Sequence, residues 1–399
     1  MSSDARDPVI VGVGESSGVG IVPGKSSLML HAEAAADALR DAGMQKESVD
    51  CVFTNESYHD YHVRHAMAFA EYFGISSSAR EIVSIPLGSG ASSGLFIHRA
   101  VDAIRSRRAD VVLAVSADNF LSGLQRSGAV KALAENRDKE FEAPYSPLLP
   151  ACFALVAQRH MHEYGTSLEE LASVAVTMRS HATLNPRAQK RAPMTISDVL
   201  NSRPVASPFT LFMCSLVSDG GAAVVVTTRE RARDLDGPAI EILGTGMAYG
   251  TGDDIRVHSS LSQTRDLLQI GTKRSSRQAM EAAGVKHVDI DLLMVYDCFA
   301  IMPILFLEAA GFVPEGEGGA FFAQGRGLLG ADLPVNTHGG MMSYAHPGNP
   351  GGFFMFPELV RQLRGECGAR QVTGAETGMV LGYGGQMAFW PTTVLGGPQ

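Results

Sequence analysis

Three side chains that can transfer protons either follow an apolar run or lie in a glycine-rich segment of the sequence. Tyr296 follows the apolar run Leu-Leu-Met-Val, and Tyr344 and His346 lie in the glycine-rich segment 336–352. A phenol has an ordinary pKa of about 10, and an imidazole exchanges protons near neutral pH. These residue types predict acid–base chemistry on a bound substrate.

Glycine-rich segments mark the places where such a substrate is expected to bind. They span residues 88–94, 336–352 and 382–386, and a fourth candidate, 296–300, follows an apolar run. In open α/β sheets, ligands bind outside the carboxyl ends of the strands, where loops of this kind lie. We therefore expect the four segments to meet at one site.

An internal repeat indicates how these loops are positioned. Residues 35–56 and 277–297 each read as a helix, a glycine cap, a short loop and an apolar strand. Gly43 matches Gly284 and Asp50 matches Asp291, with the same offset, which makes Asn55 the counterpart of Tyr296. A second pair is 109–119 and 377–387. Near-continuous apolar strands are typical of a sheet that helices cover on both faces.

The repeat predicts an α/β fold of two similar halves, residues 1–236 and 237–399. Residues 119 to 208, approximately, form an insertion in the first half, and Ser167 is expected to cap a helix there. The insertion either lines a binding site or forms a surface or dimer contact.

Composition excludes several classes of protein. A net charge of −9 argues against nucleic acid as the main partner. The absence of a long apolar run argues against a membrane span, and the first residues lack the pattern of a signal peptide. Five widely spaced cysteines fit a reducing cytoplasm, and His62 with His65 lacks a complete metal-ligand set. We expect a cytoplasmic protein without a bound metal.

The chain resembles the thiolase superfamily, and most closely its sterol-carrier-protein-type thiolases and thiolase-like lipid-transfer proteins. The stretches that carry the resemblance are 164–176, 185–209, 214–226 and the segment Ala-His-Pro-Gly-Asn-Pro-Gly-Gly at 345–352. The resemblance covers nearly the whole chain. It implies the thiolase fold, with αβαβα layers, and a CoA thioester as substrate, without a covalently bound cofactor.

The sequence departs from the family at both catalytic cysteines. Ala91 stands at the position of the nucleophilic cysteine, and Gly382 stands at that of the acid/base cysteine. Ser92 or Ser93 would need an adjacent base to replace the nucleophile, and Cys298 matches a position that is normally structural. Thiolysis is therefore not expected.

With an enolate-stabilising site but no nucleophile, the expected reaction is the retro-aldol cleavage of a β-hydroxyacyl-CoA. The pattern resembles the thiolase-fold aldolases of steroid side-chain degradation, which form a 17-ketosteroid and propionyl-CoA. That resemblance implies catalytic roles for Tyr296 and Tyr344. We expect Tyr344 to deprotonate the hydroxyl and Tyr296 to act on the enolate, or the reverse. His346 and the N–H groups of Gly384 and Gly385 are candidates for binding the thioester oxygen, in a loop arrangement that includes Asp297.

The resemblance also implies partners. CoA phosphates are expected at basic residues of the insertion, with Arg126, Arg179, Arg187 and Arg203 as candidates. A homodimer is implied, joined in a heterotetramer with a small OB-fold and zinc-ribbon protein. Two rival functions stay open. One is a Claisen-type enzyme with displaced catalytic groups, and the other is an inactive acyl-CoA or lipid carrier.

Overall fold

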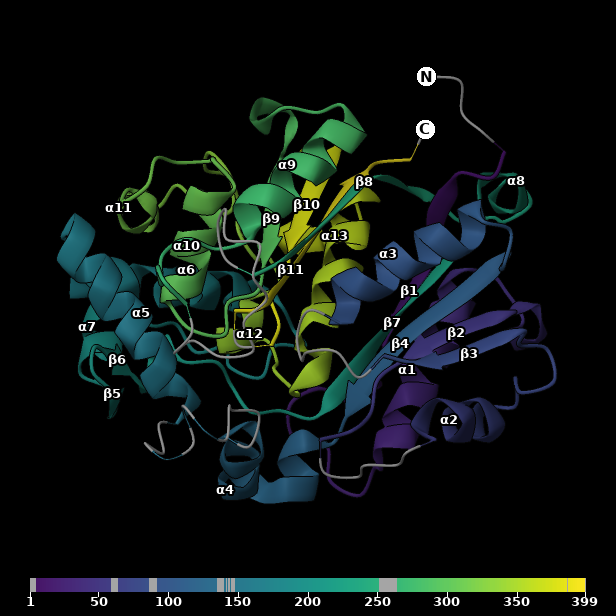
Figure 1. The fold of residues 1–399 in the computed structure, drawn as a ribbon, viewed down its shortest axis with the longest axis horizontal. Coiled ribbons are helices and arrows are strands. Elements are labelled where there is room, and N and C mark those ends of the chain that lie inside the picture. Colours follow the sequence, from purple (N-terminus) through teal and green to yellow (C-terminus); the bar gives the residue numbers. More distant parts are fainter. Residues whose placement is uncertain are drawn as a thin grey trace.

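The computed structural model describes residues 5–58, 64–85, 92–134, 148–250, 264–385 and 387–398, together with residues 140, 142 and 144. Its main sheet has nine strands in the order β3-β2-β4-β7-β1-β8-β11-β10-β9 (Figure 1). The first five strands come from residues 8–228 and the last four from residues 240–396. The sheet is therefore divided along the sequence in the same way as the internal repeat.

The elements of the first half are β1 (Pro8–Glu15), α1 (Ser27–Asp41), β2 (Cys51–Thr54), α2 (His65–Phe73), β3 (Glu81–Ser84), α3 (Ser92–Arg105), β4 (Val111–Asp118) and β7 (Gly220–Thr228). Those between β4 and β7 are α4 (Phe120–Ala134), α5 (Leu149–Tyr164), α6 (Leu168–Leu184), α7 (Ile196–Leu200), β5 (Pro204–Ala206) and β6 (Phe209–Thr210).

The elements that follow β7 are α8 (Arg229–Ala232), β8 (Ile240–Tyr249), α9 (Thr272–Ala283), β9 (Leu292–Val295), α10 (Ile301–Ala309), α11 (Gly318–Ala323), α12 (Gly340–Ser343), α13 (Met355–Leu363), β10 (Thr377–Leu381) and β11 (Phe389–Gly396). A six-residue 3-10 helix, η7 (Asn349–Phe354), precedes α13.

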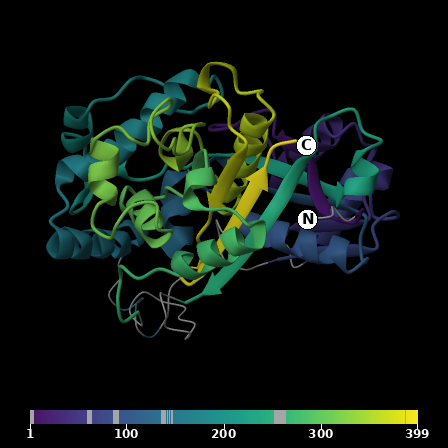
Figure 2. The same cartoon turned by 90° about the horizontal axis from the view of Figure 1, so that it is seen from above.

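The two halves share one topology. The order β2-β4-β7-β1 in the first half corresponds to β9-β10-β11-β8 in the second, with the same parallel and antiparallel pairings. β2 begins at Cys51 and β9 at Leu292, so the offset of the sequence repeat holds for the strands themselves. The halves join where β1 and β8 pair antiparallel over Val9 and Ile10. Figure 2 shows β8 and β11 side by side at this junction.

The helices form three layers around the two parts of the sheet. α1 and α2 pack on the outer face of the first half, and α9 packs on that of the second. α3 and α13 each contact strands of both halves, so they form the middle layer. β1, β4, β7 and β11 are buried along their whole length, as expected for strands covered on both faces. The layering is αβαβα, as the family resemblance implied.

The insertion is largely helical, and its helices α5, α6 and α7 lie beside the second half (Figure 1). Ser167 accepts a hydrogen bond from the backbone of Glu170, whose carboxylate accepts one from the Ser167 N–H, which completes a capping box at the start of α6. α6 packs against α11 and α12 of the second half. The insertion thereby reaches the loop that carries Tyr344 and His346.

Candidate active site

Tyr296 and His346 meet at the buried end of β9. The backbone N–H of Tyr296 donates to the Leu381 carbonyl of β10 at 3.0 Å and so extends the parallel pairing by one residue. Its hydroxyl oxygen lies 2.8 Å from Nε2 of His346, with the two rings nearly perpendicular. Tyr296 is 3% exposed and His346 is 7% exposed. The structure therefore joins two of the three predicted proton-transfer residues.

Two serines hold His346 in place. The His346 N–H donates to Oγ of Ser218 at 2.9 Å, and the Ser218 N–H donates to the His346 carbonyl at 3.2 Å. Nδ1 of the imidazole lies 3.1 Å from Oγ of Ser215, which is only partly buried. Tyr296, His346 and Ser215 thus form a line of hydrogen-bonded groups. The serines were not identified from the sequence, although both lie in the stretch 214–226 that resembles the family.

Burial sets the protonation of this pair. It lowers the pKa of His346 to about 4, against a backbone hydrogen bond to Leu216 that acts in the opposite direction. It raises the pKa of Tyr296 well above 10, and the neighbouring acidic groups of Cys298, Tyr58 and Asp297 add to the increase. At neutral pH the imidazole is uncharged and the phenol keeps its proton. The phenol is therefore a proton donor in the resting site.

A glycine makes room for the pair. A Cβ atom at Gly351, in η7, would lie 2.5 Å from Cδ2 of His346 and 3.5 Å from the Tyr296 hydroxyl. Any side chain at this position would displace the imidazole and would contact the phenol. The glycine-rich character of the segment 336–352 thus has a direct steric reason at the site.

Asp297 anchors the loop that carries His346. Its Oδ1 accepts from Nδ2 of Asn336 at 2.9 Å and from the N–H of Met341 at 2.8 Å, and its Oδ2 accepts from the N–H of Met342 at 3.2 Å. Burial raises the pKa of Asp297 to about 7, although the backbone hydrogen bonds lower it. A carboxyl group bound in this way organises the start of α12.

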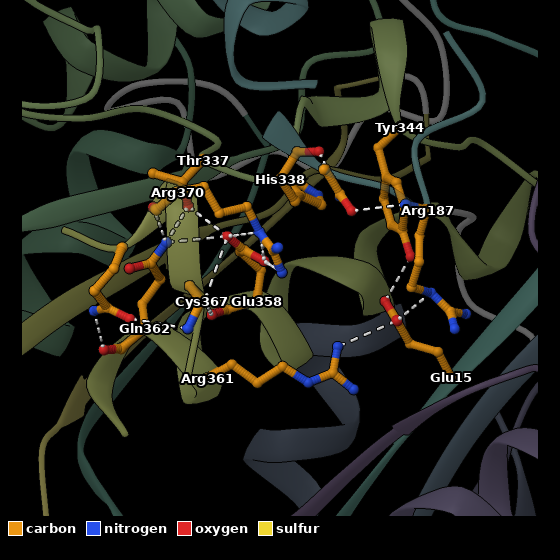
Figure 3. Close-up of polar contacts among 12 residues, drawn as sticks. Glu15, Arg187, Thr337, His338, Tyr344, Glu358, Arg361, Gln362, Cys367 and Arg370 are labelled. Carbon is orange, nitrogen blue, oxygen red and sulfur yellow. Dashed lines mark hydrogen bonds and ion pairs between the residues drawn. The ribbon is translucent and has the colours of Figure 1, made fainter. Parts of the chain in front are cut away.

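Tyr344 lies in the same loop, but its hydroxyl has a different partner. It donates to Oε1 of Glu15 at 2.8 Å, and Oε2 of Glu15 lies 3.1 Å from Arg187 and 3.2 Å from Arg361 (Figure 3). Tyr344 is 2% exposed. The two predicted tyrosines are therefore each bound to a separate group, with Tyr296 on His346 and Tyr344 on Glu15. Glu15 was not identified from the sequence, because the two residues are far apart in the chain.

The predicted oxyanion donor Gly384 needs a correction. Its N–H donates to the Phe389 carbonyl at 2.9 Å, which closes a β-bridge at the turn between β10 and β11. This N–H is therefore not available to a thioester oxygen. Gly385 has a φ of 59° and turns the chain at this point, and its role as a donor stays a prediction.

A proline fills the space at one of the absent cysteine positions. The Gly382 N–H donates to the Pro391 carbonyl at 2.9 Å, and a Cβ at Gly382 would lie 2.9 Å from Cγ of Pro391. A Cβ at Gly94 would lie 2.5 Å from Cβ of the same proline. Contacts this short require Pro391 to move, so the position does not accept a cysteine as it stands. Ala91, the other position, lies outside the described residues.

Aromatic rings surround the Tyr296 side of the site. The centroids of Tyr296 and Tyr383 lie 5.1 Å apart, and Phe299 stacks on Phe153 with 4.7 Å between centroids. Cys298 is buried here, and burial raises its pKa well above 9. A thiol in this state is a poor nucleophile. Burial of Cys298 is in keeping with the structural role that the family resemblance implied.

The predicted phosphate-binding arginines have different surroundings. Arg179 is 7% exposed and donates to Oγ of Ser343 and to the Ala192 carbonyl, so the expectation that it binds CoA phosphates is corrected. Arg187 is paired with Glu15, as described above. Arg203 is exposed and its assignment stays a prediction. The Arg126 side chain lies outside the described part of the structure.

Other predictions concern metals and membranes. Within the described residues, no group of three or more histidine, cysteine, aspartate or glutamate side chains is arranged to hold a metal ion. His62 lies outside them, and the ring of His65 packs on that of His31 with 4.9 Å between centroids. None of the described helices has the length and apolar character needed to cross a membrane.

One family model and several known proteins are similar to this chain. Residues 254–397 match a family model described as thiolase C-terminal domain-like. The chain is 34% identical over 384 residues to an acetyl-CoA acetyltransferase of Methanothermobacter thermautotrophicus, covering 95% of this chain and 97% of the relative. It is 33% identical to a 17-hydroxy-3-oxo-4-pregnene-20-carboxyl-CoA lyase of Mycobacterium tuberculosis, covering 88% and 90% of the two chains.

A solved structure, the Ltp2-ChsH2(DUF35) aldolase, also resembles the chain. Its TM-score is 0.83 at 30% sequence identity, and the alignment covers 98% of both chains. The similarity therefore extends over both halves and the insertion.

Proposed function

The chain belongs to the thiolase superfamily, among the proteins that resemble sterol-carrier-protein-2 thiolases and lie close to the steroid side-chain-cleaving aldolases, and from this we propose that it is a retro-aldolase of a β-hydroxyacyl-CoA. One observation carries the proposal. A protonated phenol, Tyr296, lies 2.8 Å from the neutral imidazole of His346, in a site that has glycine where a thiolase has its acid/base cysteine. This arrangement supports a reaction that depends on proton transfer.

The reaction begins at the β-hydroxyl group. A base takes the hydroxyl proton, the Cα–Cβ bond breaks, and its electron pair moves into the thioester to give an enolate. Tyr296 protonates the α-carbon, and a ketone and a shorter acyl-CoA leave. His346 hydrogen-bonds the phenol. Because its imidazole is neutral, Nε2 can accept this hydrogen bond from the hydroxyl. Tyr344 is the proposed base.

The proposed substrate is a steroid CoA ester with a 17-hydroxyl group, which would give a 17-ketosteroid and propionyl-CoA. Its support is the similarity to the lyase of M. tuberculosis and to the aldolase of Thermomonospora curvata, which is 33% identical over 90% of this chain. Arg203 and Arg126 are the proposed contacts for the CoA phosphates.

We also propose the assembly that the family resemblance implies. A small OB-fold protein with a zinc ribbon would complete the substrate pocket, in keeping with the DUF35 component in the name of the similar aldolase structure. The chain itself would form a homodimer. β3 supports this part of the proposal, because it is an edge strand of the sheet whose residues are only partly buried, and an edge strand can pair with another chain.

The second candidate function is acyl transfer, as in an acetyl-CoA acetyltransferase. The observation that favours it is the 34% identity with such an enzyme over nearly the whole chain. Acyl transfer requires free CoA as acceptor and an activated nucleophile. Cys298 is a poor candidate for that role, because burial raises its pKa.

Mass spectrometry of the products separates the two functions. The protein, with and without a DUF35-type partner, is incubated with 17-hydroxy-3-oxo-4-pregnene-20-carboxyl-CoA in the absence of free CoA. We expect a 17-ketosteroid and propionyl-CoA in equal amounts. Cleavage that occurs only after CoA is added would favour acyl transfer. Binding without any product, with the partner present, would rule out the proposed reaction for this substrate.

A further inference from the structure

A second buried group of charged residues lies behind Tyr344 and has no role in the reaction so far. Glu15 ends β1, Arg361 comes from α13, and Arg187 comes from the insertion (Figure 3). The Glu15 side chain is 4% exposed, Arg361 is 25% exposed and Arg187 is 40% exposed. Four segments that are remote in sequence thus meet at one carboxylate, whose two oxygens are shared between Tyr344 and the two arginines.

Electrostatics keep this carboxylate ionised. Burial alone would raise the pKa of Glu15, but Arg361 and Arg187 outweigh burial and hold its pKa below the ordinary value of 4.5. Burial and the negative charge of Glu15 raise the pKa of Tyr344 far above 10. The phenol therefore does not lose its proton to water near neutral pH. It can act as a base only if its own proton moves on at the same time, and Glu15 is the acceptor already hydrogen-bonded to it.

We propose that Glu15 is the final proton acceptor in the retro-aldol step, with Tyr344 as the relay. As the substrate hydroxyl gives its proton to the Tyr344 oxygen, the phenolic proton moves 2.8 Å along the existing hydrogen bond to Oε1 of Glu15. The step leaves a substrate alkoxide, a neutral phenol and a neutral Glu15 carboxyl group. This inference rests on the proposed function and adds the group that makes a phenol of very high pKa usable as a base.

The cycle balances without an additional reactant. The alkoxide collapses to the ketone as the Cα–Cβ bond breaks, and the enolate takes its proton from Tyr296. Glu15 then returns its proton to solvent on the side where Arg187 is partly exposed, and Tyr296 recovers a proton through His346 and Ser215. The two proton routes are separate, because Tyr344 and Tyr296 bind different groups. Each can therefore be tested alone.

Glu15→Gln is the direct test. Glutamine keeps an acceptor oxygen for the Tyr344 hydroxyl but cannot take a proton, so we expect turnover of the steroid ester to fall by about 100-fold or more, within the range of general acid–base catalysis. The Kd for the ester should change little. Exchange of the α-protons of propionyl-CoA in deuterated water, which needs only Tyr296 and His346, should persist. Glu15→Asp should recover part of the cleavage rate.

The pH profile distinguishes a proton acceptor from a structural carboxylate. Glu15 accepts a proton only when ionised, so cleavage is lost as pH falls through its low pKa. Arg361→Met removes the positive charge that lowers the Glu15 pKa most, so burial then raises this pKa. The acidic limb of the pH profile of kcat should therefore move to higher pH. The matched control is Arg370→Met, which removes an arginine from the other buried carboxylate in Figure 3, Glu358, and should leave the limb in place.

Each outcome has a defined meaning. Wild-type turnover in Glu15→Gln, or an acidic limb that does not move in an active Arg361→Met enzyme, would refute the role of Glu15 while leaving the retro-aldolase function intact. Loss of both cleavage and α-proton exchange in Glu15→Gln would show a general structural role and would also refute it. Absence of both reactions in the wild-type protein would reject the proposed function, and this inference with it.

Discussion

Single side chains decide which reaction this site can perform. The phenol of Tyr296 and the imidazole of His346 are both uncharged at neutral pH, because burial disfavours the charged form of each. A neutral pair of this kind can transfer a proton, which is what the proposed retro-aldol reaction requires of it. The chemistry thus follows from what surrounds the two groups as much as from their identity.

Tyr296→Phe tests the acid at the α-carbon. The variant keeps the ring packed against Tyr383 but removes the hydroxyl that contacts His346. Because the proposed proton donor to the α-carbon is removed, we expect both cleavage and α-proton exchange of propionyl-CoA to fall by about 100-fold or more. Deuterium incorporation measured by mass spectrometry gives the second rate. Tyr383→Phe is the control, and an equal loss there would assign the effect to packing.

Ser215 is predicted to position His346. Ser215→Ala removes the partner of Nδ1, while Ser218 still holds the His346 backbone and Tyr296 still contacts Nε2. We expect kcat to fall by roughly 5-fold, as for loss of one hydrogen bond of about 1 kcal/mol, with KM nearly unchanged. Ser215→Thr should restore most of the rate. A KM increase with unchanged kcat would instead place Ser215 in substrate binding.

Strands and helices were largely predictable from the sequence, whereas the contacts between residues far apart in the chain were not. The repeat predicted β2 and β9 at a constant offset, and Ser167 caps the start of α6 as expected. Both predictions rest on local sequence patterns. The contact of Glu15 with Tyr344 joins two distant segments, and no local signal marks it. The bond that occupies the Gly384 N–H was missed for a related reason, since it depends on how β11 returns beside β10.

The turn between β10 and β11 explains why a cysteine is not simply restored at position 382. We expect Gly382→Cys to lower the thermal midpoint by several degrees, because the new side chain meets Pro391. Pro391→Ala is also destabilising, since it leaves space beside Gly94 and Gly382. The double variant should be more stable than the sum of the single effects predicts, because the clash is gone. Strict additivity in calorimetry would show that the two residues do not interact.

The molecule as a whole buries several histidines in the uncharged state, which makes its stability depend on pH. Burial lowers the pKa of His31 to about 3, and those of His338 and His346 to about 4. In the unfolded chain each has a pKa near 6.5. Between pH 6.5 and 4 the unfolded state therefore binds more protons, and the stability contributed by these groups is lost as pH falls. Asp297, with a pKa of about 7, acts in the opposite direction.

Burial also lowers the pKa of His98 and His181, so these histidines outnumber the aspartate. We expect the net effect to be a loss of stability on acidification, on the order of 1 kcal/mol per pH unit for each histidine. The thermal midpoint should be clearly lower at pH 5 than at pH 7. His31→Gln, which removes one buried imidazole, should reduce this difference, whereas the exposed His162→Gln should not. A midpoint that is equal or higher at pH 5 would contradict the prediction that burial of these imidazoles dominates the pH dependence of stability.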